Sequence, residues 1–321
     1  MHLIMIGACY LDTILSVPHF PEQDAKLRAT SLKVRRGGNC GNGLEVLQQF
    51  LSPPSSASPP PLTSHLVTTL PSRQSAATAK VLSSFGPNSP VDLGHCIHRE
   101  DQTEAASSYI IHSRETGSRT IVNHNGLAEM TVDEFIGIAD HFKGMGAETW
   151  WHFEGRIPET ILKCIQHIRH HLPRARVSVE VEKPKRDGLR ELAAEADVVI
   201  YSRSWAEGEG YTSSEDCLTG EVERAPKASL LLCTWGARGA TALSLPSREV
   251  IHITPASDPA VQIVDAVGAG DTFVAGMLYG LLCRTEDWDA QRMVRFAVDL
   301  ATLKIQQDGF RGLASKLSPA G

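Results

Sequence analysis

The stretch "DAVGAGDTF", residues Asp265 to Phe273, places three small residues directly before an aspartate and an apolar, helix-like segment. Glycines ahead of a helix let backbone N–H groups approach an anion, and the helix dipole adds favourable charge. Gly268, Ala269 and Gly270 are therefore candidates for a phosphate-binding turn. Such a turn suits a phosphoryl group that becomes more crowded with charge in a transition state.

Asp271 ends this turn and permits two interpretations. A carboxylate in the first turn of a helix is electrostatically favourable and can simply cap the helix. Beside a phosphate-binding turn, the same carboxylate could accept a proton from a hydroxyl group that attacks the phosphate. The chain has neither G-x-x-x-x-G-K-[ST] nor a G-x-G-x-x-G after its first strand, which removes two competing nucleotide motifs.

The rest of the chain alternates strand and helix patterns. The apolar run "HLIMIGA" predicts a buried first strand, and from "ETWWHFEGR" onward short apolar strands such as "DVVIYS" alternate with helical segments. This alternation predicts an α/β fold with a doubly wound, mainly parallel sheet and helices on both faces. "GGNCGNGLEVLQQFL" predicts a Gly-rich corner followed by a helix.

Segments 12–36 and 105–125 mix β-branched and polar residues, as half-exposed strands do, and predict a small β-sheet lid. The second segment reads as a hairpin with its turn at Glu115–Ser118. The Pro/Ser-rich run at 52–64 can neither pack nor continue a helix, so we expect a surface insertion there. The 321 residues are expected to form one domain, 1–321.

Composition narrows the class of partner. Scattered basic residues, 31 Lys+Arg against 37 Asp+Glu, argue against nucleic acid and against an anionic membrane. No apolar run is long enough to span a bilayer and no basic leader is present, which predicts a cytoplasmic protein. Seven cysteines without a C-x-x-C pair argue against disulfides and structural zinc, and the 13 histidines lack metal-binding spacing.

A second motif, "RRGGNCGN" at residues 35–42, makes the first one more specific. Together with "DAVGAGDTFVAG", it resembles the paired motifs of the ribokinase-like (PfkB) sugar kinases, and "SRTIV", "HFEGR" and "QDGFRG" are similar to the ketohexokinase branch of that family. The resemblance runs to about Gly312 and is poorest between Leu51 and Ala105. It implies a ribokinase-like fold, ATP, Mg²⁺ and a sugar as ligands, and a homodimer formed through the β lid. It leaves activation by K⁺ open.

By position, the resemblance assigns the catalytic base to Asp271 and the anion hole to the three small residues before it. The sugar-binding positions of the family correspond here to Asp12, Gly38, Asn39 and Asn42, with Asp24 reaching a sugar site across the dimer. Carboxylate and amide side chains also suit a polyhydroxyl ligand on chemical grounds. The alternatives are a helix N-cap and a surface amide for the two asparagines, and a solvated loop carboxylate for Asp24.

The nucleotide-binding positions correspond to Arg119, Gly236, Ala237, Arg238 and Gly239. The alternatives are an exposed charge near a hairpin turn for Arg119 and a simple hairpin turn for "WGARG". Glu180 and Glu182 share one face of a strand end, which fits a glycosidase pair, a Mg²⁺ site or a solvated strand end. Lys183 is a candidate for neutralising phosphate charge.

The family's Asn-x-x-Glu motif, which organises the metal, is replaced here by Ser202, Arg203, Ser204 and Trp205, so no Mg²⁺ ligand is assigned. The expected reaction transfers the ATP γ-phosphoryl to a ketohexose, with D-fructose giving fructose 1-phosphate. Two alternatives stay open. One is a family kinase for ribose, a keto-deoxy sugar acid or a nucleoside such as adenosine, and the other is a non-catalytic binding or regulatory module.

Overall fold

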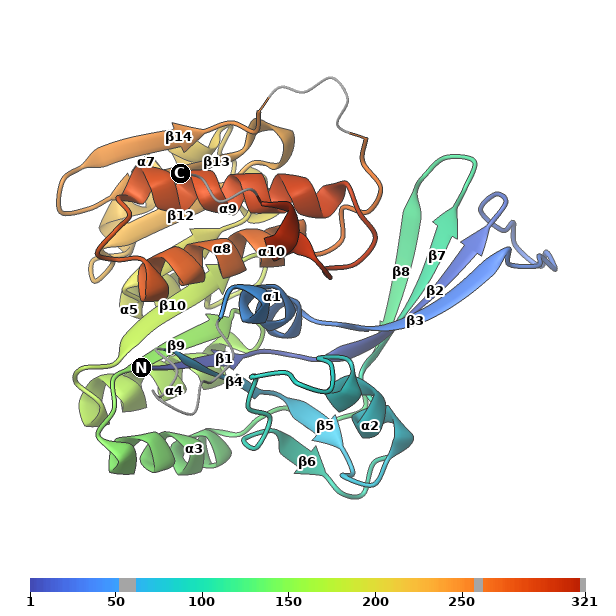
Figure 1. Cartoon of the computed structure of the whole chain (residues 1–321), viewed down its shortest axis with the longest axis horizontal. Coiled ribbons are helices and arrows are strands. Elements are labelled where there is room, and N and C mark those ends of the chain that lie inside the picture. Colours follow the sequence, from blue (N-terminus) through green and yellow to red (C-terminus); the bar gives the residue numbers. More distant parts are fainter. Residues whose placement is uncertain (52–61, 257–261, 318–321) are drawn as a thin grey trace.

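The computed structural model describes residues 1–51, 62–256 and 262–317, and its centre is an eight-stranded sheet. The strands lie in the order β14 (Glu249–Ile253), β13 (Ala240–Ser244), β12 (Leu230–Thr234), β11 (Val198–Tyr201), β10 (Arg176–Val181), β9 (Thr149–Glu154), β1 (His2–Ile6) and β4 (Thr63–Val67) (Figure 1). The strands from β12 to β4 are parallel, and β13 pairs antiparallel with both β12 and β14. The predicted doubly wound, mainly parallel sheet is confirmed.

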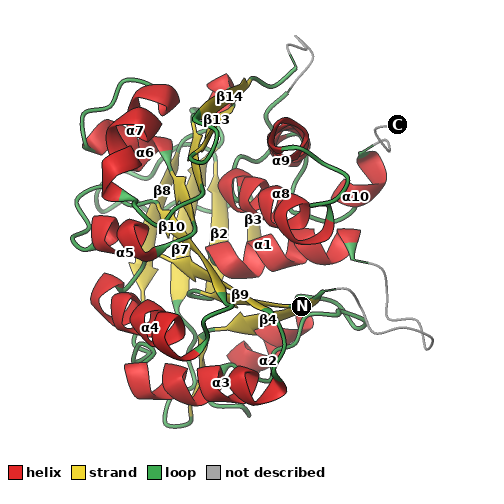
Figure 2. Cartoon of the chain, turned by 90° about the vertical axis from the view of Figure 1, so that its left-hand side faces the viewer, coloured by secondary structure: helices red, strands yellow, loops and turns green. Residues whose placement is uncertain are grey.

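Helices cover both faces of this sheet (Figure 2). One face carries α1 (Asn39–Leu47) with the 3₁₀ turn η1 (Gln48–Phe50), α8 (Ala269–Cys283), α9 (Ala290–Ile305) and α10 (Leu313–Lys316). The other face carries α3 (Val132–Met145), α4 (Pro158–His171), α5 (Leu189–Glu195), α6 (Arg203–Gly208) and α7 (Ser214–Glu221) with η2 (Val222–Arg224). Each helical layer packs against the sheet to form a hydrophobic core. The core under α8 includes Phe273, and the core under α3 includes Phe135.

The position of β1 follows from its composition. Leu3, Ile4 and Met5 are all buried, because helices cover both faces of the sheet and successive side chains point to opposite faces. The parallel strands β1, β9 and β10 point in the same direction, so the loops that follow their carboxyl ends lie side by side. The candidate site lies at these carboxyl ends.

A separate four-stranded sheet forms the predicted lid, with the order β3 (Ser31–Gly37), β2 (Tyr10–Val17), β7 (Ser107–Ser113) and β8 (Arg119–His124). Figure 1 shows it projecting from the body of the molecule. The register of its strands shows which side chains share each face of the sheet. We call the face that carries Arg35 the inner face, because Arg35 contacts Asp265 in the body of the molecule. The inner face includes Asp12, Lys33, Arg35, Ile110 and Ile121, and the outer face includes Thr13, Leu32, Val34, Tyr109 and Val122.

The parallel pair β5 (Thr69–Pro71) and β6 (Ile97–Arg99) and the helix α2 (Ala76–Ser83) lie between β4 and the lid hairpin in the chain. The predicted insertion at 52–64 falls on residues outside the described ranges up to 61. Its predicted end is wrong, because Thr63 and Ser64 pair with β1 as part of β4. All seven cysteines are free. Among the residues that the structure describes, no helix is long and apolar enough to cross a membrane.

Candidate active site

The anion-hole candidates form the start of α8. Gly268 is the N-cap residue and has a φ of 79°, a left-handed conformation that L side chains rarely adopt. A Cβ atom at this position would come within 2.3 Å of Cζ of Phe310. Ala269 and Gly270 follow as the first residues of the helix. N–H groups of a first helical turn have no partner inside the helix, so they are available to an anion.

Asp271 lies in the same turn but does not cap the helix, because Gly268 is the N-cap and no side-chain cap bond is present there. Instead, Oδ2 of Asp271 accepts a hydrogen bond of 2.7 Å from Nδ2 of Asn42 in α1. Asn42 is 5% exposed, so the alternative of a surface amide is wrong. The two sequence motifs therefore meet at one hydrogen bond.

Several carboxylates surround Asp271. Burial, reinforced by the negative charge of Glu180, raises the pKa of Asp271 to about 8, while the hydrogen bond from Asn42 acts in the opposite direction. Burial likewise raises the pKa of Glu154 to about 7, although Oε2 of Glu154 accepts a hydrogen bond of 2.9 Å from the N–H of Ala8. Carboxyl groups that titrate near neutral pH are suited to proton transfer. The concentration of negative charge also favours a bound cation.

Glu180 is 6% exposed, so the alternative of a solvated strand end is wrong for this residue. Its Oε1 lies 2.9 Å from Nε2 of His152, and its Oε2 accepts a hydrogen bond of 2.9 Å from Nδ2 of Asn39. The same nitrogen of Asn39 donates to Oε2 of Glu182 at 3.1 Å. Asn39 thus bridges two carboxylates, and the N-cap of α1 is Gly38, not Asn39.

Asp12 is buried on the inner face of the lid, at 7% exposure. Burial raises the pKa of Asp12, and a hydrogen bond with Ser108 opposes that rise. A Cβ atom on Gly37 would lie 2.5 Å from Oδ2 of Asp12, so the carboxylate packs against the backbone just before α1. Asp12 therefore lies beside the turn that presents Gly38 and Asn39.

Asp265, the first residue of the "DAVGAGDTF" motif, ties the lid to the body. Its Oδ2 accepts from Nη1 of Arg35 and from Nζ of Lys304, each at 3.1 Å, and its Oδ1 lies 3.9 Å from Nη1 of Arg119. Burial alone would raise the pKa of Asp265, but the N–H of Val267 and the nearby cations hold it below its usual value. Arg35 and Arg119 belong to the two edge strands of the lid, so both edges reach this motif.

"WGARG" forms the turn of the hairpin between β12 and β13. Residues Gly236–Arg238 make the 3₁₀ turn η3, and the N–H of Gly239 donates to the carbonyl of Gly236 at 2.9 Å. Gly236, Ala237 and Arg238 are exposed beyond the carboxyl end of β12, where ligands bind in sheets of this kind. The backbone is a hairpin turn, and its nucleotide-binding role stays a prediction.

Two predicted residues lie at the margin of the site. Asp24 is exposed in the loop that joins β2 and β3 at the far end of the lid (Figure 1). Lys183 follows β10 and pairs with Glu182 at 2.7 Å, with 54% of its side chain exposed. The structure therefore gathers Asp12, Gly38, Asn39, Asn42 and the start of α8, whereas Asp24 stands apart.

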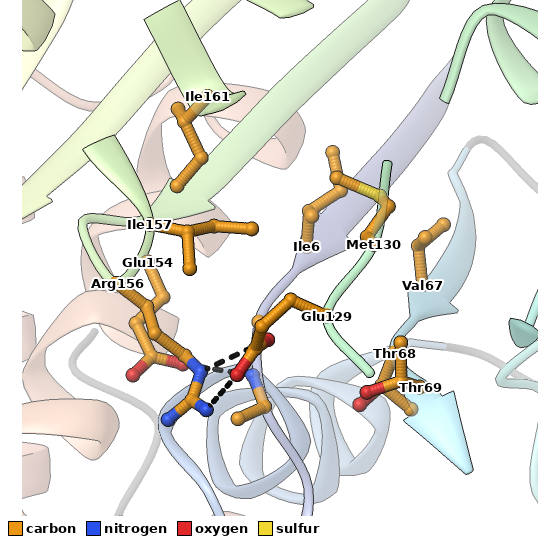
Figure 3. Close-up of a pocket in the computed structure, with 12 residues that line it drawn as sticks. Ile6, Val67, Thr68, Thr69, Glu129, Met130, Glu154, Arg156, Ile157 and Ile161 are labelled. Atoms are coloured by element: carbon orange, nitrogen blue, oxygen red, sulfur yellow. Dashed lines mark hydrogen bonds and ion pairs between the residues drawn. The ribbon is translucent and has the colours of Figure 1, made fainter. Parts of the chain in front are cut away.

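A cavity of about 30 Å³ lies beside Glu154 (Figure 3). Arg156 forms an ion pair with Glu129 among its lining residues, and the side chains of Ile6 and Ile157 add apolar wall. This volume holds only a few water molecules. The cavity is therefore too small to take a sugar.

Sequence reasoning did not single out Glu154 or His152. Both come from β9, and they meet Ala8 after β1 and Glu180 in β10 through parallel strand pairing. The available signal was the position of Glu154 at the carboxyl end of a buried strand. Only the strand order, which the sequence does not state, makes them neighbours.

The fold matches those of ribokinases. The ribokinase from Giardia lamblia has a TM-score of 0.76 at 17% identity, covering 98% of this chain and 94% of that one. The Arabidopsis thaliana ribokinase complexed with ribose and ATP has a TM-score of 0.71 at 17% identity, covering 96% and 93%. The structural likeness thus defines a ribokinase-like α/β protein.

The sequence comparisons identify the family. The description "pfkB family carbohydrate kinase" matches residues 2–316. Ketohexokinase from Mus musculus is 30% identical over 319 residues, which cover 97% of this chain and 98% of that protein. The chain belongs to the PfkB family of carbohydrate kinases, which use ATP with Mg²⁺.

Proposed function

We propose that this protein transfers the γ-phosphoryl group of ATP to a hydroxyl group of a ketohexose, with D-fructose giving fructose 1-phosphate. The observation that carries the proposal is the hydrogen bond between Asn42 and Asp271, which joins the two motifs in one site. The preference for fructose rests on the similarity to ketohexokinase, which extends over nearly the whole chain.

Asp271 acts as the catalytic base. Asn42 occupies Oδ2 and favours the ionised carboxylate, which leaves Oδ1 for the sugar hydroxyl. As the hydroxyl oxygen bonds to the γ-phosphorus, its proton passes to Asp271 and the bond from that phosphorus to the ADP oxygen breaks. Because the pKa of Asp271 is about 8, only part of the free protein holds the active, ionised form at neutral pH.

The remaining residues bind and orient the substrates. N–H groups of residues 268–271 stabilise the equatorial oxygens of the phosphoryl group, and Arg119 offsets polyphosphate charge. Asp12, Asn39 and Asn42 bind sugar hydroxyls, for which their oxygen and nitrogen atoms are suited. Closure of the lid excludes water that would otherwise compete as acceptor. The turn Gly236–Gly239, whose first three residues are exposed, is the candidate nucleotide loop.

Mg²⁺ would offset the charge of the ATP phosphates. The donor set fits, because Mg²⁺ prefers carboxylate oxygens and Glu182 offers one whose side chain is 32% exposed next to the buried Glu180. Glu182 is therefore our candidate ligand for the metal, because Ser202–Trp205 replaces the family's Asn-x-x-Glu motif in this chain. Its pairing with Lys183 is exposed and weak enough to exchange for a metal.

A homodimer through the outer face of the lid is part of the proposal. Leu32, Tyr109 and Val122 on that face are 63%, 52% and 61% exposed, which is unusual for large apolar side chains. β3 and β8 also leave unpaired sheet edges. In such a dimer, Asp24 at the far end of the lid would be the residue that approaches the partner's sugar site.

The test is ADP formation with ATP and a panel of fructose, ribose, a keto-deoxy sugar acid and adenosine, using wild-type protein and Asp271→Asn. Fructose-dependent ADP formation, with fructose 1-phosphate as product and loss in the variant, supports the proposal. Preference for another acceptor overturns the fructose assignment, and no sugar-dependent turnover at all favours a binding module. Repeating the assay in K⁺ and Na⁺ buffers tests the open prediction of K⁺ activation.

A further inference from the structure

Four histidines and one aspartate gather at the β4 edge of the large sheet, in a group that we call the histidine cluster. It consists of His2 in β1, His65 in β4, Asp92 and His95 before β6, and His141 in α3. Nδ1 of His2 lies 2.9 Å from Nε2 of His65, and the ring centroids of His95 and His141 are 4.9 Å apart. The cluster contains four of the 13 histidines in the chain.

Three members offer a preformed set of metal ligands. One ligand atom from each of His65, Asp92 and His95 lies within 4.8 Å of the other two. Ligand atoms around a tetrahedral Zn²⁺ are separated by about 3.3–3.5 Å, given metal–ligand distances near 2.0–2.1 Å. Small side-chain rotations therefore suffice to close the set around an ion.

The buried nitrogen of His65 lacks a satisfactory partner. Its Nδ1 lies 3.0 Å from Oδ2 of Asp92, but among the described residues it has no partner with hydrogen-bond geometry. The His65 side chain is only 5% exposed, so water cannot readily replace that partner. A metal ion between His65 and Asp92 would satisfy both groups.

The backbone and the neighbouring groups hold these ligands in place. Asp92 extends the edge of β4, since its N–H donates to Ser64 at 2.8 Å and its carbonyl accepts from Leu66 at 3.0 Å. Its Oδ1 accepts from the N–H of Gly94 at 2.7 Å, which turns Oδ2 toward His65. Metal-bound histidines usually have their second ring nitrogen hydrogen-bonded, and the contact of His65 with His2 provides that arrangement.

We propose that His65, Asp92 and His95 bind one Zn²⁺ ion at the β4 edge. Two imidazoles and one carboxylate suit Zn²⁺ and related first-row metals, not Mg²⁺, which prefers oxygen ligands alone. The fourth position falls to water or to His141 beside His95. Asp271 lies beyond the carboxyl ends of the strands and in the opposite helical layer, so this ion joins an edge strand to a loop and takes no part in phosphoryl transfer.

The direct test is titration of tag-free, chelator-treated full-length protein with Zn²⁺ by calorimetry and with Co²⁺ by visible absorption. The wild type should bind one equivalent with a tetrahedral Co²⁺ spectrum. His95→Ala and Asp92→Asn, which spare the buried His65, should each weaken binding more than about tenfold. Zn²⁺ should raise the unfolding temperature of the wild type but not of His95→Ala.

A competing site provides the matched control. His167 and His171 lie one turn apart on α4, with ring centroids 4.2 Å apart, and could themselves chelate a metal. His171→Ala should leave the tight site intact. Loss of binding in His171→Ala with retention in His95→Ala would overturn the proposal, as would the absence of stoichiometric binding by the wild type.

Discussion

Nδ2 of Asn42 donates a 2.7 Å hydrogen bond to Oδ2 of Asp271, although 229 positions separate the two residues in the chain. The bond joins the first turn of α1 to the first turn of α8. The hydrogen bond from Asn42 favours the ionised carboxylate, whereas burial and Glu180 oppose it. The protonation state of Asp271 depends on this balance, and changes on either side of it should be visible in the pH dependence of activity.

Replacing Asp271 by Asn should abolish most turnover, because the amide cannot accept the hydroxyl proton. General-base catalysis contributes about 10²–10⁴-fold, so kcat should fall by at least about 10²-fold. The affinity for ATP, measured by calorimetry with a non-hydrolysable analogue, should change little since the N–H groups of the turn remain. Retained turnover in this variant would contradict the role of Asp271.

Asn42→Ala should move the acidic limb of the kcat/KM profile to higher pH. The base works when ionised, so activity rises as pH increases through the pKa of Asp271, about 8 in the free protein. The hydrogen bond from Asn42 favours the ionised form, and its removal raises that pKa. The variant should therefore recover part of its activity at alkaline pH. An unchanged midpoint with a uniform loss would mean that Asn42 only positions the sugar.

Glu180→Gln should shift the same limb to lower pH. Among the charged groups, Glu180 has the largest effect on the pKa of Asp271, so neutralising Glu180 makes ionisation of Asp271 easier. Gln can still accept the hydrogen bond from Asn39, which keeps the local geometry. Glu182→Gln is the matched comparison and should produce a smaller shift, because Glu182 acts more weakly on Asp271. A larger shift in Glu182→Gln would contradict this account of the site.

Gly268→Ala should destabilise the protein, whereas Gly270→Ala should not. An L residue at the φ of 79° found at Gly268 costs about 1–2 kcal/mol, and its Cβ would also collide with Phe310. A Cβ at Gly270 meets no described atom within 4 Å, so Ala there should be neutral or stabilising by about 0.5–1 kcal/mol. Urea unfolding measures the free energy of unfolding of both variants, and the m-value should stay unchanged. Equal effects in the two variants would count against the strain at Gly268.

The sequence predicted the parts of this site that lie inside contiguous motifs. Gly268 to Asp271 and Gly38 to Asn42 were recognisable because a glycine turn before a helix has its own local pattern. The environment of Asp271 was not predictable, since Glu154 and Glu180 come from separate strands and become neighbours only through the order of β9 and β10. A glutamate at a strand end looks solvated in the sequence, whereas Glu180 is buried and contacts both Asn39 and His152.

The same distinction applies to the lid. Its strands were predictable from their mix of β-branched and polar residues, but its faces depend on register, which pairs Tyr109 with Val122 and Ile110 with Ile121. Likewise, histidines with no metal-binding spacing in the sequence came together from two strands, a loop and a helix. Contacts between distant segments require strand order and register, and neither is encoded in a local pattern.

Val122→Lys should dissociate the proposed homodimer, because a charge on the outer face of the lid would have to be buried in the interface. Ile121→Lys is the matched control: it is the adjacent residue in β8, is similarly exposed at 52% against 61%, and lies on the inner face. Light scattering coupled to size-exclusion chromatography should give a dimer for the wild type and Ile121→Lys, and a monomer for Val122→Lys. If Asp24 serves the partner's site, Val122→Lys should also raise the KM for the sugar while leaving the KM for ATP unchanged. A wild-type monomer, or a dimer that survives Val122→Lys, would contradict the interface.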